Sequence, residues 1–118
     1  MGTQPLSVEH VIAPGHGILR LKGPMLADNL SPFLNALRGN SANTVILDMS
    51  EVPYIDSAGL GSLVSAYVSS QKSGRRVILA GVNRRVLRVF QITKVEPLFL
   101  IFSSVFEALD ALTGAAEA

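Results

Sequence analysis

The chain of 118 residues is 48% hydrophobic and 16% charged, which suits one packed domain and excludes wholesale disorder. Ten basic residues nearly balance nine acidic ones, and the net charge of +1 provides no general positive field for binding nucleic acid. The absence of cysteine excludes disulfides and thiolate chemistry. The start has no signal-peptide pattern, and no apolar run approaches the ~20 residues that cross a bilayer, so we expect a cytoplasmic domain without membrane insertion.

Two strands are predicted first, at residues 7–13 and 17–22. In the second strand Leu19 and Leu21 alternate with Arg20 and Lys22, as on a sheet with one face in water. The pair Gly23–Pro24 then ends the second strand. Residues 27–37 have the apolar spacing of a helix. Because proline fits only in the first turn of a helix, Pro32 places the start of this helix shortly before itself.

A continuous apolar run at residues 44–49 is typical of a central strand that is buried on both faces. A long helix is predicted over residues 58–72, because its apolar side chains recur at the spacing of one helical face. Residues 77–80 form another buried strand. Asn83 then stands where it can cap a short helix over residues 84–91.

A last strand is predicted at residues 98–102, and Ser103 or Ser104 follows as the cap of a final helix. The order is β-β-α-β-α-β-α-β-α, and right-handed crossovers then place parallel strands in the middle. The fold class is therefore α/β: a single domain over residues 6–113 with a mixed sheet of about five strands and about four helices. Residues 114–118 are predicted to form a short flexible tail.

The segment Ile55–Val64, IDSAGLGSLV, joins a turn to the long helix and carries the most functional information. Asp56 or Ser57 can cap that helix, because a helix start leaves backbone N–H groups unpaired and carries a partial positive charge. Capping alone would explain both residues. Gly59 and Gly61 each cost a helix about 1 kcal/mol relative to alanine. These glycines serve either close approach by a partner or packing within the domain.

Three other patterns give little support to catalysis or metal binding. The Gly-x-Gly pair lacks the lysine and the spacing of a nucleotide-binding loop, so a nucleotide-handling enzyme would rest only on glycines and one serine. His10 and His16 lack the spacing of metal ligands. Asp48 and Asp56 have no nearby histidine or cofactor loop, and we expect them to hydrogen-bond turns rather than act as an acid/base pair.

Two surface features leave alternatives open. Arg84, Arg85 and Arg88 form a basic cluster on the short helix, which is either simply solvated or attracts an acidic partner. The second feature is a row of small side chains on the long helix, which is either a solvated face or a flat contact surface continuous with Ser57. The row consists of Ser62, Ser65, Ala66, Ser69 and Ser70.

The apolar strand Val45–Asp48, followed by Asp56–Gly61 with sequence DSAGLG, closely resembles the STAS domain of the anti-sigma factor antagonists of bacterial partner-switching systems. The resemblance implies a protein-binding module without catalytic residues, metal or cofactor. In that family an anti-sigma factor that is also a serine kinase phosphorylates the serine of the block. The unmodified protein binds this kinase and releases the sigma factor, and a PP2C-type phosphatase resets the switch. By position, the phosphorylated residue is Ser57.

The same resemblance predicts a partner-binding surface around the start of the long helix. Its residues are Asp56, Ser57, Ala58, Gly59, Gly61, Ser62 and Asp28. The chain departs from the family at Gly23–Leu26, where the family has Gly-x-apolar-Asp and this sequence has no acid. Asp28 follows two residues later. This departure motivates an alternative partner, a membrane lipid-transport ABC ATPase that the domain would regulate as a STAS subunit.

Overall fold

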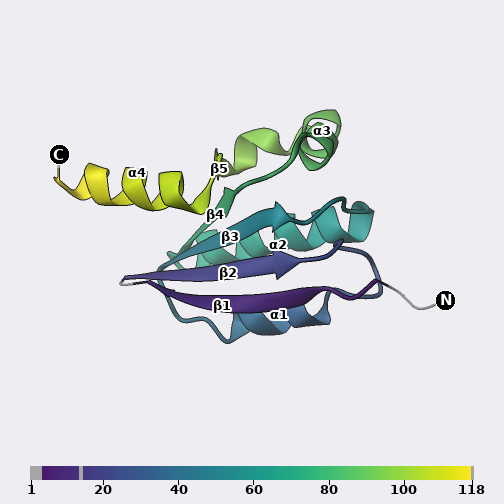
Figure 1. The fold of residues 1–118 in the computed structure, drawn as a ribbon, viewed down its shortest axis with the longest axis horizontal. Coiled ribbons are helices and arrows are strands. Elements are labelled where there is room, and N and C mark those ends of the chain that lie inside the picture. The colour runs from purple at the N-terminus through teal and green to yellow at the C-terminus, as the bar shows by residue number, and fades with distance from the viewer. Residues whose placement is uncertain (1–3, 14, 118) are drawn as a thin grey trace.

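The computed structural model describes residues 4–13 and 15–117. It contains a five-stranded sheet whose strands lie side by side in chain order. The first two strands pair antiparallel, and each later strand pairs parallel to the one before it (Figure 1). The strands are β1 (Ser7–Ala13), β2 (His16–Lys22), β3 (Thr44–Glu51), β4 (Arg76–Ala80) and β5 (Leu100–Phe102). The α/β class and the mixed sheet predicted from the sequence are confirmed.

Three helices cover one face of the sheet, and the last helix packs on the other face. The helices are α1 (Ser31–Arg38), α2 (Ser57–Lys72), α3 (Arg84–Ile92) and α4 (Val105–Glu117), with a short 3-10 turn at Glu96–Leu98. Figure 1 shows α3 at the end of the sheet where β2 and β3 finish, and α4 extending toward the opposite end. Helix α3 and the start of α2 therefore lie at the end of the sheet where the parallel strands have their carboxyl ends.

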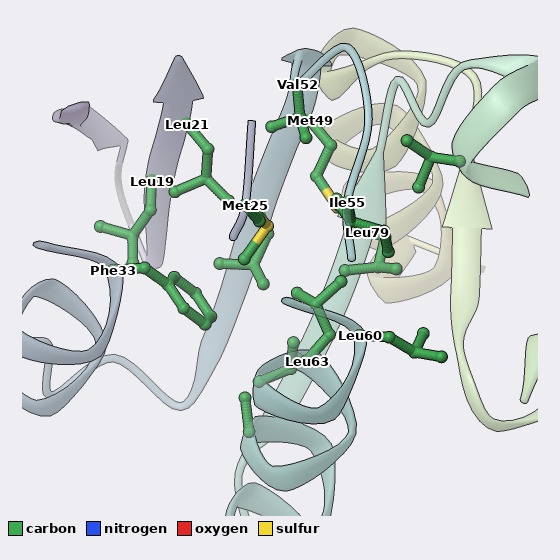
Figure 2. Packing of buried hydrophobic residues seen from close by; sticks show 14 of the residues in the cluster. Leu19, Leu21, Met25, Phe33, Met49, Val52, Ile55, Leu60, Leu63 and Leu79 are labelled. Carbon is green, nitrogen blue, oxygen red and sulfur yellow. The ribbon is translucent and has the colours of Figure 1, made fainter. Parts of the chain in front are cut away.

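The main core lies between the sheet and helices α1 to α3. Along β3, Val45 and Leu47 join this core, while Ile46 between them joins the cluster under α4. All three are at most 1% exposed, which explains the uninterrupted apolar run in the sequence. Figure 2 shows part of the main core, with Leu60 and Leu63 from the start of α2 and Met25 from the preceding loop among its labelled side chains. This packing fixes the position of α2 relative to the sheet.

The α4 face of the sheet has a smaller apolar cluster and a polar group beside it. Asp48, which is only 7% exposed, accepts a hydrogen bond from Arg20 Nε at 3.2 Å. Its other oxygen accepts from the backbone N–H of Ser50 at 3.0 Å and from the Ser50 hydroxyl at 2.8 Å. Arg20 also reaches Glu9 at 2.9 Å. Both carboxylate oxygens of Asp48 thus accept hydrogen bonds within the fold, as expected from the sequence.

Most element boundaries lie within a residue or two of the prediction. Helix α1 begins at Ser31, directly before Pro32 as predicted, and a turn occupies the preceding residues. The predicted strand 98–102 is shorter, since Leu98 belongs to the 3-10 turn and β5 begins at Leu100. Helix α4 follows a cap at Ser104, whose hydroxyl accepts from the backbone N–H of Glu107 at 3.1 Å. It continues to Glu117, so the predicted tail is helical that far, and residue 118 lies outside the described residues.

Candidate functional site

Asp56 caps helix α2, which settles the choice between Asp56 and Ser57 left open by the sequence. Its backbone is extended, and its Oδ1 accepts a hydrogen bond from the backbone N–H of Gly59 at 2.9 Å. Its Oδ2 accepts from the backbone N–H of Ala27 at 3.0 Å, from a loop 29 residues earlier in the chain. These hydrogen bonds, first of all the one from Gly59, hold the pKa of Asp56 below its usual value. One carboxylate therefore joins the helix start to the preceding loop.

Backbone contacts hold the same loop against the segment that leads into α2. Met25 and Ile55 form an isolated parallel bridge. The N–H of Met25 donates to the carbonyl oxygen of Tyr54 at 3.2 Å, and the N–H of Asp56 donates to the carbonyl oxygen of Met25 at 3.1 Å. Met25 is fully buried. The family that this sequence resembles has its acid at the last position of the segment that matches Gly23–Leu26. In this structure that position directly follows Met25 and so lies beside tightly packed backbone.

The two glycines of the block serve different surroundings. Gly59 is buried, and a Cβ built on it would lie 2.3 Å from the carbonyl oxygen of Met25. A Cβ built on Gly61 would meet nothing within 4 Å, and Gly61 is exposed. Gly59 is therefore explained by packing inside the domain. Gly61 has no internal explanation and leaves the backbone of α2 open to an approaching surface.

Ser57 is the first residue of α2, and it is exposed. Ala58 beside it is half-buried. The hydroxyl of Ser62, one turn further on, donates to the carbonyl oxygen of Gly59 at 2.7 Å and so remains within the helix. Of the residues on α2 that the resemblance assigns to partner binding, Ser57 and Gly61 are the two that are exposed to solvent.

Asp28 is exposed in the turn before α1, directly after the residue whose N–H binds Asp56. The hydrogen bond from Ala27 to Asp56 thus brings the segment containing Asp28 to the start of α2. The Asp28 side chain borders a shallow hollow of about 310 Å³ on the side of α1. Its role toward a partner stays a prediction.

Asn29, which the sequence analysis overlooked, organises this loop. Its Oδ1 accepts from the backbone N–H of Leu26 at 2.8 Å. Its Nδ2 donates to the carbonyl oxygens of Pro24 at 2.8 Å and Gln4 at 2.9 Å. An asparagine within a Gly-Pro loop is a common turn former, and that local signal could have identified it.

The row of small residues on α2 does not form the flat contact surface that was one of the two alternatives left open by the sequence. Ala66 is 4% exposed, and the row lines a groove of about 310 Å³ between α1 and α2. Helix α1 forms the other wall through Leu34 and Leu37. The small side chains produce a hollow because α1 lies beside them without filling the space above. The groove begins at Ser62, one turn from the start of α2.

On its other side the candidate site borders α3. Asn83 caps α3 by accepting from the backbone N–H of Val86 at 2.8 Å, as predicted. The Asn83 amide also donates to the carbonyl oxygens of Val52 at 3.0 Å and Pro53 at 3.2 Å. The Arg85 guanidinium lies 4.9 Å from the centre of the Tyr54 ring. Helix α3 is therefore joined to the segment that leads into Asp56.

A family model for the STAS domain matches residues 7–108. The chain belongs to the STAS domain family. Over 72 residues it is 35% identical to a protein of Thermotoga neapolitana named as a candidate anti-sigma factor antagonist. That match covers 61% of this chain and 64% of the relative, so this chain spans less than two thirds of the relative's length.

Two solved structures resemble this STAS domain over nearly their whole length. A candidate anti-sigma factor antagonist from Thermotoga maritima has 27% identity and a TM-score of 0.74, over 88% of this chain and 92% of its own. A sulfate transporter family protein from Wolinella succinogenes has 27% identity and a TM-score of 0.73, over 92% of this chain and 93% of its own. The fold thus occurs in proteins named for signalling and for transport.

Within the described residues, no group of three His, Cys, Asp or Glu side chains is placed to hold a metal ion. None of the helices in the described ranges is long and apolar enough to cross a bilayer. The candidate site consists of the Asp56 cap, the exposed Ser57 and the loop and helix that flank them.

Proposed function

We propose that this STAS domain is an anti-sigma factor antagonist of a bacterial partner-switching system. The unphosphorylated form binds an anti-sigma factor that is also a serine kinase, and this binding releases the sigma factor. The kinase phosphorylates Ser57, which ends the complex, and a PP2C-type phosphatase restores the serine. In this proposal the domain is a binding module and a kinase substrate, with no catalysis of its own. The observation that carries it is the exposed Ser57 at the first position of α2.

The position of Ser57 suits a reversible phosphate. Phosphorylation adds about 1.5 to 2 negative charges. The positive end of a helix stabilises nearby negative charge by about 0.3–1 kcal/mol. Asp56 opposes it, since two unit charges about 6 Å apart repel by roughly 0.7 kcal/mol in water. These terms are similar in size, so we expect the isolated domain to stay folded when Ser57 is phosphorylated.

The same phosphate has a larger effect in a docked complex. When a partner excludes water, the effective dielectric falls, and at a value of about 20 the same pair of charges repels by ~3 kcal/mol. The phosphate also loses hydration unless the partner supplies hydrogen bonds. A loss of about 2.7 kcal/mol weakens binding roughly a hundredfold. Phosphorylation at Ser57 therefore acts on the interface rather than on folding.

The test combines intact-mass analysis with binding. Protein purified from its native cell should carry phosphate on Ser57 in a fraction that changes with growth conditions. Ser57→Ala should keep its affinity for the anti-sigma factor kinase, whereas Ser57→Asp should bind at least about tenfold more weakly with unchanged thermal stability. Ser41→Asp is the matched control, because Ser41 is an exposed serine just before β3 and so lies at the opposite end of that strand from the segment leading to Ser57. Equal affinity of wild type, Ser57→Asp and phosphorylated protein would refute the proposal.

The resemblance to the sulfate transporter family protein favours one alternative. In it the domain is a STAS subunit that regulates a membrane transport system, such as a lipid-transport ABC ATPase, and Ser57 is not modified. The lack of an acid within Gly23–Leu26 agrees with a partner other than the kinase. Co-purification with an ABC-type ATPase, together with unphosphorylated Ser57 under all growth conditions, would favour this alternative.

A further inference from the structure

Helix α3 presents three arginines that have no salt-bridge partner among the described residues. Arg84, Arg85 and Arg88 are all exposed, and the helix has no acidic residue in its first turn. Within the described residues, the carboxylates that lie within 4.0 Å of an arginine or lysine are those paired with Arg20. More broadly, the chain from residue 57 to residue 95 contains no aspartate or glutamate. In the part of the chain that the structure describes, the basic cluster therefore has no ion-pair partner.

This arrangement costs stability. Arg84, Arg85 and Arg88 occupy the first, second and fifth positions of α3, near the positive end of the helix. A cation there is unfavourable, because it faces the positive end of the helix dipole. Arg84 and Arg88 are also four residues apart on the helix, where like charges repel each other. Packing of the core does not require Arg84 or Arg88, because α3 is anchored by the buried Val86 and Phe90.

The basic cluster lies beside the candidate site. The Asn83 amide binds the carbonyl oxygens of Val52 and Pro53, and Arg85 stacks on Tyr54. Those residues lead directly into Asp56 and Ser57. Figure 1 shows α3 at the end of the sheet where β2 and β3 finish, which is also where α2 starts. A partner that covers Ser57 thus approaches α3 from the same side.

We propose that Arg84, Arg85 and Arg88 form an electrostatic docking patch for an acidic surface on the anti-sigma factor kinase. This inference rests on the proposed function and adds the charge of the partner's surface. An acidic partner neutralises the cluster and removes its internal repulsion. Complementary charge at one edge of an interface raises the association rate and weakens steeply with salt. The cluster therefore governs how fast the complex forms, and Ser57 governs whether it persists.

The test compares two double charge reversals of equal charge. Arg84→Glu with Arg88→Glu changes the patch and leaves the Arg85–Tyr54 contact in place. Lys72→Glu with Arg76→Glu is the control. Both residues are exposed at the opposite end of the sheet, where Lys72 is the last residue of α2 and Arg76 is the first residue of β4. The patch variant should be at least as stable as wild type, since glutamate near a helix start is favourable. A loss of binding then cannot come from unfolding.

The probe is the purified kinase that phosphorylates Ser57 of the wild-type protein. At about 50 mM NaCl the patch variant should associate roughly tenfold more slowly than the control variant, and at about 500 mM NaCl the difference should nearly vanish. Phosphorylation of Ser57 in both variants with equal association rates would overturn the docking patch and leave the proposed function intact. Failure of any kinase to modify wild-type Ser57 would overturn both. Unchanged kinase association, with patch-dependent binding to a DNA duplex or to phosphatidylserine vesicles instead, would also overturn the inference.

Discussion

Separate replacement of Gly59 and Gly61 by alanine should change stability in opposite directions. Both glycines lie in the first two turns of α2, where alanine gains about 1 kcal/mol of helix propensity over glycine. At Gly61 nothing lies within 4 Å of the added Cβ, so the full gain remains. We expect Gly61→Ala to stabilise the domain by about 0.8–1 kcal/mol and to raise Tm by roughly 3–4 °C.

At Gly59 the added methyl group meets fixed backbone. The Cβ would lie 2.3 Å from the carbonyl oxygen of Met25 and 2.9 Å from its Cβ. Met25 cannot retreat, because it is fully buried and its carbonyl accepts the N–H of Asp56 at 3.1 Å. Overpacking costs about 1–3 kcal/mol and the weakened hydrogen bond about 1 kcal/mol, against a propensity gain of about 1 kcal/mol. Gly59→Ala should therefore destabilise the domain by about 1–3 kcal/mol.

Urea unfolding followed by circular dichroism measures both variants, with the midpoint as the readout and the slope as a check on two-state behaviour. The two alanine variants should differ by about 2–4 kcal/mol in the free energy of unfolding. A Gly59→Ala variant as stable as wild type would refute the close approach of Met25 to α2. The same pair tests binding, because Gly61→Ala should bind the kinase more weakly despite its higher stability if a partner approaches the helix backbone there.

Two further predictions concern Asp56 and Asn29. Backbone N–H groups lower the pKa of Asp56 in the folded state, so the unfolded chain binds more protons. The stability that the carboxylate contributes is complete above its unfolded pKa of about 4 and is lost as the pH falls through the lower folded value. Tm should therefore fall less between pH 5 and pH 2, in rough terms, for Asp56→Asn than for wild type, and parallel curves would contradict the pairing. Asn29→Ala removes three hydrogen bonds from the loop before α1 and should lower the free energy of unfolding by about 1–3 kcal/mol in urea, with an unchanged midpoint as the contrary result.

The strands and helices could be predicted because burial imposes a period on the sequence. Strand β3 is buried on both faces and reads as an unbroken apolar run, while α3 turns Val86 and Phe90 inward at helical spacing. The start of α1 could be placed because Pro32 fits only in the first turn of a helix, whereas the apolar spacing alone continues back to Leu30, before the helix begins. A turn supported by the Asn29 side chain occupies those preceding residues, and apolar spacing does not register such a turn.

The site was harder to predict than the fold, because its geometry depends on contacts between distant segments. The sequence places Ser57 at a helix start, but the two glycines of the block are locally alike. What separates them is the carbonyl of Met25, brought to Gly59 by a bridge to Ile55 some thirty positions away in the chain. The groove beside α2 likewise could not be predicted from the sequence of α2 alone, since it exists only because α1 runs alongside Ala66. Local patterns identify a helix start; tertiary contacts decide which of its atoms a partner can reach.

The capping geometry also decides how a phosphate on Ser57 would be accommodated. Both oxygens of Asp56 already accept backbone N–H groups, one from Gly59 and one from Ala27. A hydrogen bond to a charged group contributes about 1.5–3 kcal/mol, and Asp56 accepts two of them. Displacing Asp56 would therefore cost more than the roughly 1–1.4 kcal/mol of repulsion that a hydrated phosphate of about 1.5 to 2 charges exerts on it. The carboxylate therefore keeps the cap, and the phosphate projects from the same helix start into solvent. Its charge then adds to that of Asp56 on the outer surface, where only an incoming partner meets both.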